Sequence, residues 1–226
     1  MSPARSALSS TLIQKAAMAV TGLILFGFLI GHMGGNLKAL QGSQKLNQYA
    51  EHLREMGMPI FDRGQLLWIA RLVLLGALGV HVAATVSLTV RNREARPVGY
   101  AYRKTPETSG VSRTMIVTGP LLLVFVVFHI LHFTTGQAHP NFRPGDVYAN
   151  VVNGFHGHLV VVGVYVAAMA ALGAHLFHGL WSLFQTLGLN HPKWNAYRGG
   201  FAAVASALLV LGFLAVPIGV ALGIIH

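Results

Sequence analysis

The chain has 226 residues, of which 54% are hydrophobic and only 10% are charged, with a formal net charge of +10. A soluble globular protein spends about 25% of its residues on Asp, Glu, Lys and Arg, so this composition, with a mean hydropathy of +0.58, argues against a soluble domain. The sequence contains no cysteine, which excludes disulfides, thiolate metal sites and iron–sulfur clusters on this chain, and it lacks the phosphate-loop and G-x-S-x-G motifs of nucleotide enzymes and serine hydrolases.

Five stretches of the sequence lack Asp, Glu, Lys and Arg, and each can hold a membrane-spanning helix of about 20 residues. They cover residues 16–37, 72–90, 114–142, 147–192 and 199–226. We therefore expect an all-α integral membrane protein whose residues 1–226 form one transmembrane bundle. The transmembrane helices are expected at about 12–35, 66–90, 114–135, 155–184 and 199–225.

The connection between the first two helices is expected to hold a short amphipathic helix on the outer surface. Ser43 is a plausible N-cap, apolar residues follow it at helical spacing, and Gly57 before Pro59 ends the pattern. The first transmembrane helix is expected to be retained, because no A-x-A-like cleavage site follows it. The sequence shows no internal repeat.

The basic residues predict the orientation of the helices. With the amino terminus in the cytoplasm, ten of them fall on inner segments: Arg5, Lys15, Arg91, Arg93, Arg96, Arg103, Lys104, Arg113, Lys193 and Arg198. The outer segments hold five, which are Lys38, Lys45, Arg54, Arg63 and Arg143, together with the acids Glu51, Glu55, Asp62 and Asp146. The positive-inside rule therefore predicts a cytoplasmic amino terminus and an outer carboxyl terminus. Anionic headgroups or an acidic partner explain the net charge without nucleic acid.

Four of the five expected helices carry a histidine within the apolar body: His32, His81, His129 and His175. Ionisable residues inside a membrane are rare and are functional by default. Because successive helices run in opposite directions, position along each helix converts to depth at about 1.5 Å per residue. His32 and His129 then share the outer half of the bilayer and His81 and His175 the inner half, offset by roughly 10 Å.

Two histidine pairs at two depths suit two bis-histidine haems, because neutral imidazole is a good axial ligand and facing helices can clamp a porphyrin. Small residues beside these histidines leave room or serve helix packing: Gly27, Gly31 and Gly35 in the first helix, and Ala168, Ala171 and Gly179 in the fourth. An iron with two histidine ligands has no open position, which favours electron transfer. Since the chain has no flavin or cluster motif, the expected membrane-soluble redox partner is a quinone.

At these residues the sequence resembles the single-chain, five-helix, dihaem cytochrome b anchors of succinate:quinone oxidoreductases and fumarate reductases. Segment 21–33 reads T-G-L-I-L-F-G-F-L-I-G-H-M and is similar to the family's T-G…G-H segment. Segment 118–129 repeats the family's eleven-residue step from Thr118 to the ligand His129. The most specific match is His175-Leu-Phe-His-Gly-Leu-Trp in the fourth helix.

The resemblance covers nearly the whole chain and implies the same ligand pairs, His32 with His129 (outer haem) and His81 with His175 (inner haem). It implies an inner-membrane complex in which a flavoprotein oxidises succinate and an iron–sulfur protein passes electrons to the two haems b and on to quinone, menaquinone or ubiquinone. Some fumarate reductases have a glutamate two residues before the fourth-helix ligand, thought to help protons cross. Gly173 stands there in this chain, so the proton path is not transferred.

Other polar residues are candidates for supporting roles. Arg71, Arg113 and Lys15 could bind haem propionates by charge-assisted hydrogen bonds, or reach to headgroups. His132 and His178, three residues beyond expected ligands, are second-shell or interfacial candidates. The candidates for proton exchange at a quinone, each otherwise a solvated surface residue, are Glu51, Glu55, His156 and His158.

Two other classes stay open at this stage. One is the dihaem cytochrome b subunit of another quinone-linked enzyme, such as a hydrogenase or formate dehydrogenase. The other is a proton-coupled transporter that uses its histidines as a relay.

Overall fold

The computed structural model describes residues 10–95, 109–189 and 191–226, without the side chains of residues 109–113, 192 and 196. Within these ranges all the regular structure is helical. The elements in chain order are α2 (Thr11–Asn36), the 3-10 helix η1 (Leu37–Gln41), α3 (Ser43–Glu55), α4 (Gln65–Glu94), α5 (Ser109–Phe133), α6 (Val147–Phe155), α7 (Leu159–Thr186) and α8 (Pro192–Ala221).

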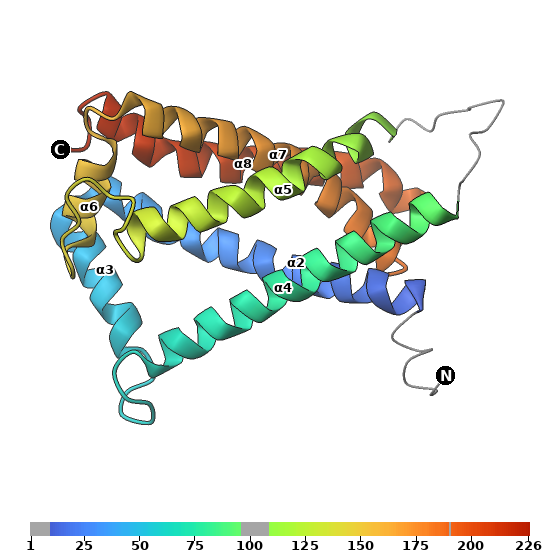
Figure 1. Ribbon diagram of the computed structural model, residues 1–226, viewed down its shortest axis with the longest axis horizontal. Helices are drawn as coiled ribbons and strands as arrows, with labels where there is room; N and C mark the ends of the chain where they lie inside the picture. The colour runs from blue at the N-terminus through green and yellow to red at the C-terminus, as the bar shows by residue number, and fades with distance from the viewer. Residues whose placement is uncertain (1–9, 96–108, 190) are drawn as a thin grey trace.

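Five of these helices are long and apolar enough to cross a membrane, which confirms the expected fold class. They are α2, α4, α5, α7 and α8, and consecutive long helices run in opposite directions along the length of the molecule (Figure 1). Large apolar side chains on their outer faces are exposed, such as Val124, Leu75 and Leu211. A membrane span buries such side chains against lipid.

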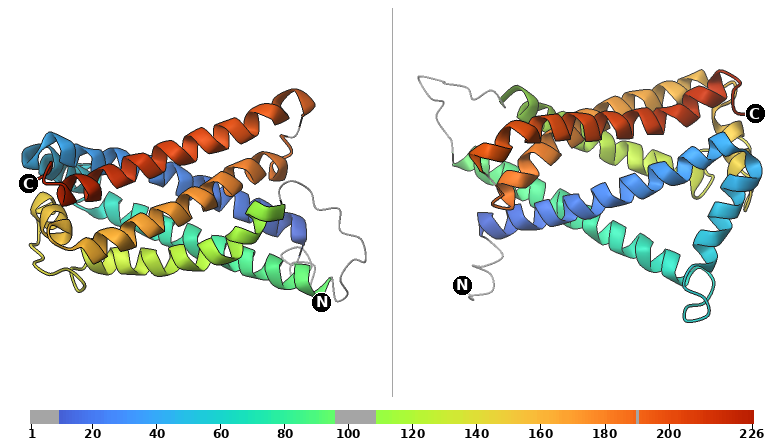
Figure 2. Two further views of the ribbon diagram at one scale, coloured as in Figure 1. Left: turned by 90° about the horizontal axis from the view of Figure 1, so that it is seen from above. Right: turned by 180° about the vertical axis from the view of Figure 1, so that it is seen from behind.

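The two ends of the bundle differ in construction. At one end η1, α3 and α6 gather beside the end of α8, and this region is called the α3/α6 end below (Figures 1 and 2). The other end holds the first turns of α2 and the last turns of α4 and α7. The position of each histidine along the bundle is described below relative to these two ends.

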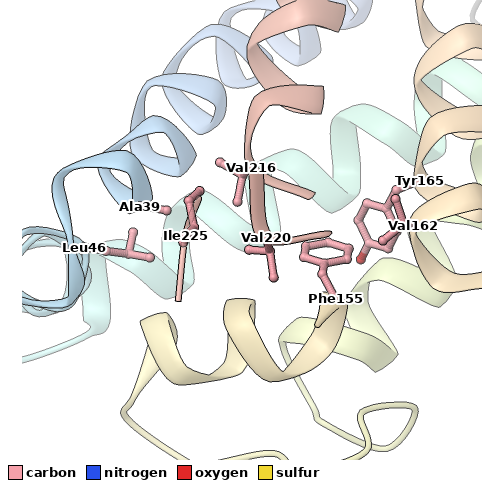
Figure 3. Packing of buried hydrophobic residues seen from close by; sticks show 8 residues of the cluster. All are labelled: Ala39, Leu46, Phe155, Val162, Tyr165, Val216, Val220 and Ile225. Carbon is pink, nitrogen blue, oxygen red and sulfur yellow. The ribbon is translucent and has the colours of Figure 1, made fainter. Parts of the chain in front are cut away.

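A clamp between α3 and α6 closes the α3/α6 end. Asn47 of α3 donates through Nδ2 to Oδ1 of Asp146, at 3.0 Å, and accepts at Oδ1 from the backbone N–H of Tyr148. Asp146 also caps α6, since its carboxylate accepts from the N–H of Ala149. An apolar cluster lies at the same end, where Phe155 lies between Val220 and Tyr165 and Ile225 lies beside Ala39 (Figure 3).

A break separates α6 from α7 where the sequence suggested one helix starting near Phe155. Gly157 has a φ of 74°, in the left-handed region that favours glycine, and α7 begins at Leu159. The α6 helix was not foreseen, because its nine residues follow turn-forming residues that resemble a loop. The expected cap Ser43 is the first residue of α3, and Gly42 is the N-cap.

The long helices also reach further than their apolar runs. The α4 helix continues through Arg91 and Arg93 to Glu94, beyond the expected end at about residue 90. Arginine and glutamate are good helix formers, so loss of hydropathy does not end a helix. The α8 helix likewise begins at Pro192 rather than near residue 199, because proline suits the first turn of a helix.

Candidate functional site: two histidine pairs between the helices

The structure brings the four intramembrane histidines together as two pairs. The rings of His32 on α2 and His129 on α5 have centres 5.8 Å apart. The rings of His81 on α4 and His175 on α7 have centres 6.4 Å apart. These are the pairs that depth along alternating helices predicts, and each joins helices that are not neighbours in the sequence.

The two pairs occupy different levels of the bundle. Gly22 of α2 lies beside the second pair, since a Cβ atom placed there would be 3.4 Å from Cε1 of His81. His32 follows ten residues later on the same helix, which corresponds to about 15 Å along the helix axis. The separation along the helix is thus larger than the rough 10 Å expected along the membrane normal. The His32/His129 pair lies nearer the α3/α6 end.

Hydrogen bonds fix the proton position on the His81 ring. Its Nδ1 lies 3.2 Å from the carbonyl oxygen of Met18, and a carbonyl can only accept, so Nδ1 carries the proton. The Thr21 hydroxyl donates to the Ala17 carbonyl and lies 3.3 Å from the same Nδ1, where its oxygen can accept. Nε2 of His81 therefore carries a lone pair that can bind a ligand.

His175 has a corresponding partner. The Thr118 hydroxyl of α5 lies 3.3 Å from its Nδ1. A Cβ atom on the next residue, Gly119, would be 4.0 Å from Cε1 of His175. A threonine followed by glycine thus lies beside each imidazole of this pair and contacts its Nδ1. When Nδ1 of His175 donates to the Thr118 hydroxyl oxygen, as Nδ1 of His81 donates to the Met18 carbonyl, Nε2 of both rings can bind a ligand.

The His32/His129 pair has a different set of neighbours. Nδ1 of His129 lies 3.0 Å from the hydroxyl of Tyr165 on α7, and the same hydroxyl lies 3.0 Å from Nδ1 of His132. His32 is packed between the rings of Phe28, at 5.2 Å, and Phe213, at 5.8 Å. One pair is therefore held by threonines and a carbonyl, and the other by a tyrosine and aromatic packing.

The spacing within both pairs fits one metal between two imidazoles. An imidazole nitrogen lies about 2 Å from a bound first-row metal and about 1.1 Å from its own ring centre, so rings on opposite sides of one metal have centres about 6 Å apart. The observed separations are 5.8 and 6.4 Å. All four rings are only partly buried by protein. The residues present therefore fit a planar group ligated from both faces.

The small residues near the histidines serve two purposes. Gly27, Gly31 and Gly179 have open space where a Cβ atom would lie, with nothing within 4 Å. Gly35 instead packs against Tyr49, since a Cβ atom there would be 2.7 Å from its ring. Ala168 and Ala171 are buried among other helices. Three of these six small residues therefore have unfilled space beside them, and the other three contribute to packing.

The expected propionate partners lie on the surface where their side chains are described. The guanidinium of Arg71 stacks 4.7 Å from the ring centre of the exposed Trp68, which is a cation–π contact. Lys15 is exposed near the start of α2. The side chain of Arg113 lies outside the described part of the chain, as do Arg5, Arg96, Arg103 and Lys104 from the orientation argument. His178 is half-buried, and its Nδ1 has no hydrogen-bond partner among the described residues.

The four residues expected near a quinone all lie at the α3/α6 end. Glu51 accepts from both Arg54, at 3.1 Å, and Arg63, and its hydrogen bond with Arg63 is the main cause that holds the pKa of its carboxyl below the ordinary range. Glu55, His156 and His158 are exposed. Glu51 is therefore a paired carboxylate, whereas the other three are open to solvent or headgroups.

Three polar residues of the bundle, Tyr165, His139 and Arg198, are not among the site residues expected from the sequence. Tyr165 is 7% exposed and lies between two histidines; the signal available was that it is the only hydroxyl-bearing residue between Leu159 and His175. His139 is buried and bonds the Asn150 carbonyl at 2.8 Å, which holds the α5–α6 connection. Arg198 is buried, and its Nε and Nη1 have no hydrogen-bond partner among the described residues, so these N–H groups can donate to an anionic group.

Comparison with known proteins identifies the family. The family model described as the succinate dehydrogenase/fumarate reductase transmembrane subunit matches residues 89–215, which is more than half of the chain. The matched region contains His129 and His175, whereas His32 and His81 precede it. No curated protein and no solved structure matches the chain. The chain therefore belongs to the family of transmembrane subunits of succinate dehydrogenase and fumarate reductase.

Proposed function

We propose that this subunit is a dihaem cytochrome b that passes electrons between the iron–sulfur subunit of a succinate dehydrogenase or fumarate reductase complex and a membrane quinone. His32 and His129 would hold one haem b, and His81 and His175 the other. The observation that carries the proposal is the pair of facing imidazoles at each of two levels, with centres 5.8 and 6.4 Å apart.

The protein's contribution at each site is to present Nε2 of two rings from opposite helices. A metal-bound histidine usually donates its other ring N–H to a carbonyl or a comparable acceptor, which fixes the ring and raises its basicity. The Met18 carbonyl and the Thr21 hydroxyl oxygen provide this for His81. Bis-histidine haem supplies one-electron chemistry without an open coordination position. The rings of Phe28 and Phe213 pack against His32, and the ring of Phe125 packs against His129.

Two levels of haem in one subunit connect the two faces of a membrane. The end opposite the α3/α6 end carries Arg91, Arg93 and Lys193, which suits an inner face that docks the hydrophilic flavoprotein and iron–sulfur subunits. The α3/α6 end pairs Glu51 with two arginines, which reduces its net positive charge. We therefore infer a cytoplasmic amino terminus in the cell inner (cytoplasmic) membrane.

The optical spectrum of the purified complex tests the haem proposal. Membranes that contain the subunit with its hydrophilic partners should give a dithionite-reduced cytochrome b spectrum with two haems per chain. Succinate should reduce them, and a ubiquinone or menaquinone analogue should oxidise them. A colourless complex would overturn the proposal and favour a subunit that anchors the complex or moves protons without haem.

Site-directed labelling tests the orientation, because the wild-type chain has no cysteine to interfere. Asn141 is exposed at the α3/α6 end, and Glu94 is exposed at the last residue of α4, near the opposite end of the bundle. Each can be replaced by cysteine, as Asn141→Cys or Glu94→Cys. An impermeant maleimide should label the first in intact cells and the second only after permeabilisation. The reverse pattern would overturn the inferred orientation.

A further inference from the structure

The hydroxyl of Tyr165 joins a proposed haem ligand to a buried histidine. It lies 3.0 Å from Nδ1 of His129 and 3.0 Å from Nδ1 of His132. Tyr165 is 7% exposed and His132 is fully buried, so bulk water does not compete for these contacts. Nε2 of His132 has no hydrogen-bond partner among the described residues. The three side chains form a short chain with a defined end.

The direction of this chain follows from counting hydrogens. The hydroxyl has one hydrogen, so at least one of the two imidazoles must donate to its oxygen. If His129 ligates iron through Nε2, its proton is on Nδ1 and it donates to Tyr165. The hydroxyl hydrogen then needs an acceptor, and Nδ1 of His132 lies 3.0 Å away, so the arrangement that satisfies this hydrogen places the His132 proton on Nε2. If the Tyr165 hydroxyl instead donated to Nδ1 of His129, the proton of His129 would lie on Nε2, and Nε2 could not bind iron.

We propose, on the basis of the function proposed above, that Tyr165 is a positioning residue for His129. Its hydroxyl accepts from His129 and donates to His132, which holds His129 in the tautomer that ligates through Nε2 and sets how strongly that ligand donates to iron. An acceptor on the ligand N–H makes an imidazole more basic and favours ferric iron. Tyr165 therefore lowers the reduction potential of the His32/His129 haem.

The aromatic ring of Tyr165 is packed independently of its hydroxyl, so a substitution can remove the hydroxyl and keep the ring. It contacts Phe125, Phe133 and Phe155, with ring centres 5.0, 6.0 and 4.9 Å away. Tyr165→Phe keeps the ring and removes only the oxygen. At position 132 the Oδ1 of Asn can replace Nδ1 as acceptor, whereas Leu cannot accept. His132→Asn and His132→Leu are therefore a matched pair.

Redox titration of the two haems in the purified complex measures the effect. In Tyr165→Phe the His32/His129 haem should become easier to reduce, by about tenfold in the ferrous-to-ferric ratio at a fixed potential, or about 59 mV for one electron, or its occupancy should fall. His132→Leu should shift it less in the same direction, and His132→Asn should match wild type. The His81/His175 haem should keep its potential in all three.

The outcomes separate this inference from the proposed function. If the wild type holds two haems, and neither Tyr165→Phe nor His132→Leu changes the potential or the occupancy of the His32/His129 haem, the role of Tyr165 is overturned. The proposed function would still stand in that case. If Tyr165→Phe loses both haems through misfolding, a shift in His132→Leu that is absent from His132→Asn supports the chain, and equal behaviour of the two overturns it. A wild-type complex without haem would overturn both the proposed function and this inference.

Discussion

Thr21 of α2 places its hydroxyl oxygen 3.3 Å from Nδ1 of His81 on α4, across 60 positions of sequence. Thr118 of α5 stands at the same distance from Nδ1 of His175 on α7. Each threonine is followed by glycine, and each precedes the histidine of the other pair by eleven residues. The same threonine–histidine contact therefore occurs in the α2–α4 pair and in the α5–α7 pair. The rest of the sequence shows no such repeat.

The first prediction concerns these threonines. Thr118→Val removes the hydroxyl contact at Nδ1 of His175, whereas Thr21→Val leaves His81 with the Met18 carbonyl. Loss of such an outer partner costs about 10–100-fold in metal affinity at most sites studied. We expect Thr118→Val to reduce the occupancy of the His81/His175 haem more than Thr21→Val does, as measured by haem content per chain. Equal losses in the two variants would contradict this account.

The second prediction concerns the histidine pairs. His81→Ala or His175→Ala should remove one haem component, and His32→Ala or His129→Ala the other, because an imidazole from each helix is needed to ligate both faces. Reduced-minus-oxidised spectra recorded during a redox titration separate the components. The pairing would be refuted if all four variants lost the same component.

The histidine pairing was accessible from sequence because helix direction and rise are regular. Alternating spans convert positions 32, 81, 129 and 175 into two depths without any side-chain detail. The partners of those histidines were not accessible. Whether Tyr165 meets His129 depends on the rotation of α7 against α5, which apolar packing decides and which a run of uniform hydropathy does not record.

The α6 helix shows a second limit of sequence reasoning. The sequence predicts a connection here, because Arg143-Pro144-Gly145-Asp146 is rich in turn formers. In the structure Asp146 is the cap of a helix, and Asn47 from α3 holds that cap. A contact between residues 99 positions apart cannot be read from either segment alone.

The third prediction compares adjacent glycines at the end of α2. Gly34 has nothing within 4 Å of an added Cβ atom, whereas Gly35 would place one 2.7 Å from the Tyr49 ring of α3. Gly35→Leu should therefore destabilise the fold by about 1–3 kcal/mol through overpacking, and Gly34→Leu should not. Thermal unfolding in detergent, followed by circular dichroism, compares them. Equal melting temperatures would show that Tyr49 moves freely.

The fourth prediction concerns pH and the α6 cap. The N–H of Ala149, followed by the amide of Asn47, holds the pKa of Asp146 below its ordinary value of 3.8. Stability from this carboxylate is thus complete above about pH 4 and is lost as pH falls through the lower folded-state pKa. Asp146→Ala should cost about 1 kcal/mol at neutral pH.

Asparagine at the same position is the control for the cap. Asp146→Asn keeps an oxygen that can cap the helix but does not titrate. The stability difference between wild type and Asp146→Asn should therefore narrow as the pH falls below 4. Melting curves across this pH range measure it, and a constant difference would exclude the carboxylate as the titrating group.

Gly173 lies against α8, where a Cβ atom would come within 3.0 Å of Cγ2 of Val210. The resemblance to the dihaem anchors places the glutamate of some fumarate reductases at this position. A side chain introduced there would require Val210 to move by about a few tenths of an ångström, and a smaller residue at position 210 would remove this conflict. Residues 173 and 210 are thus expected to change together when homologues of this subunit are compared.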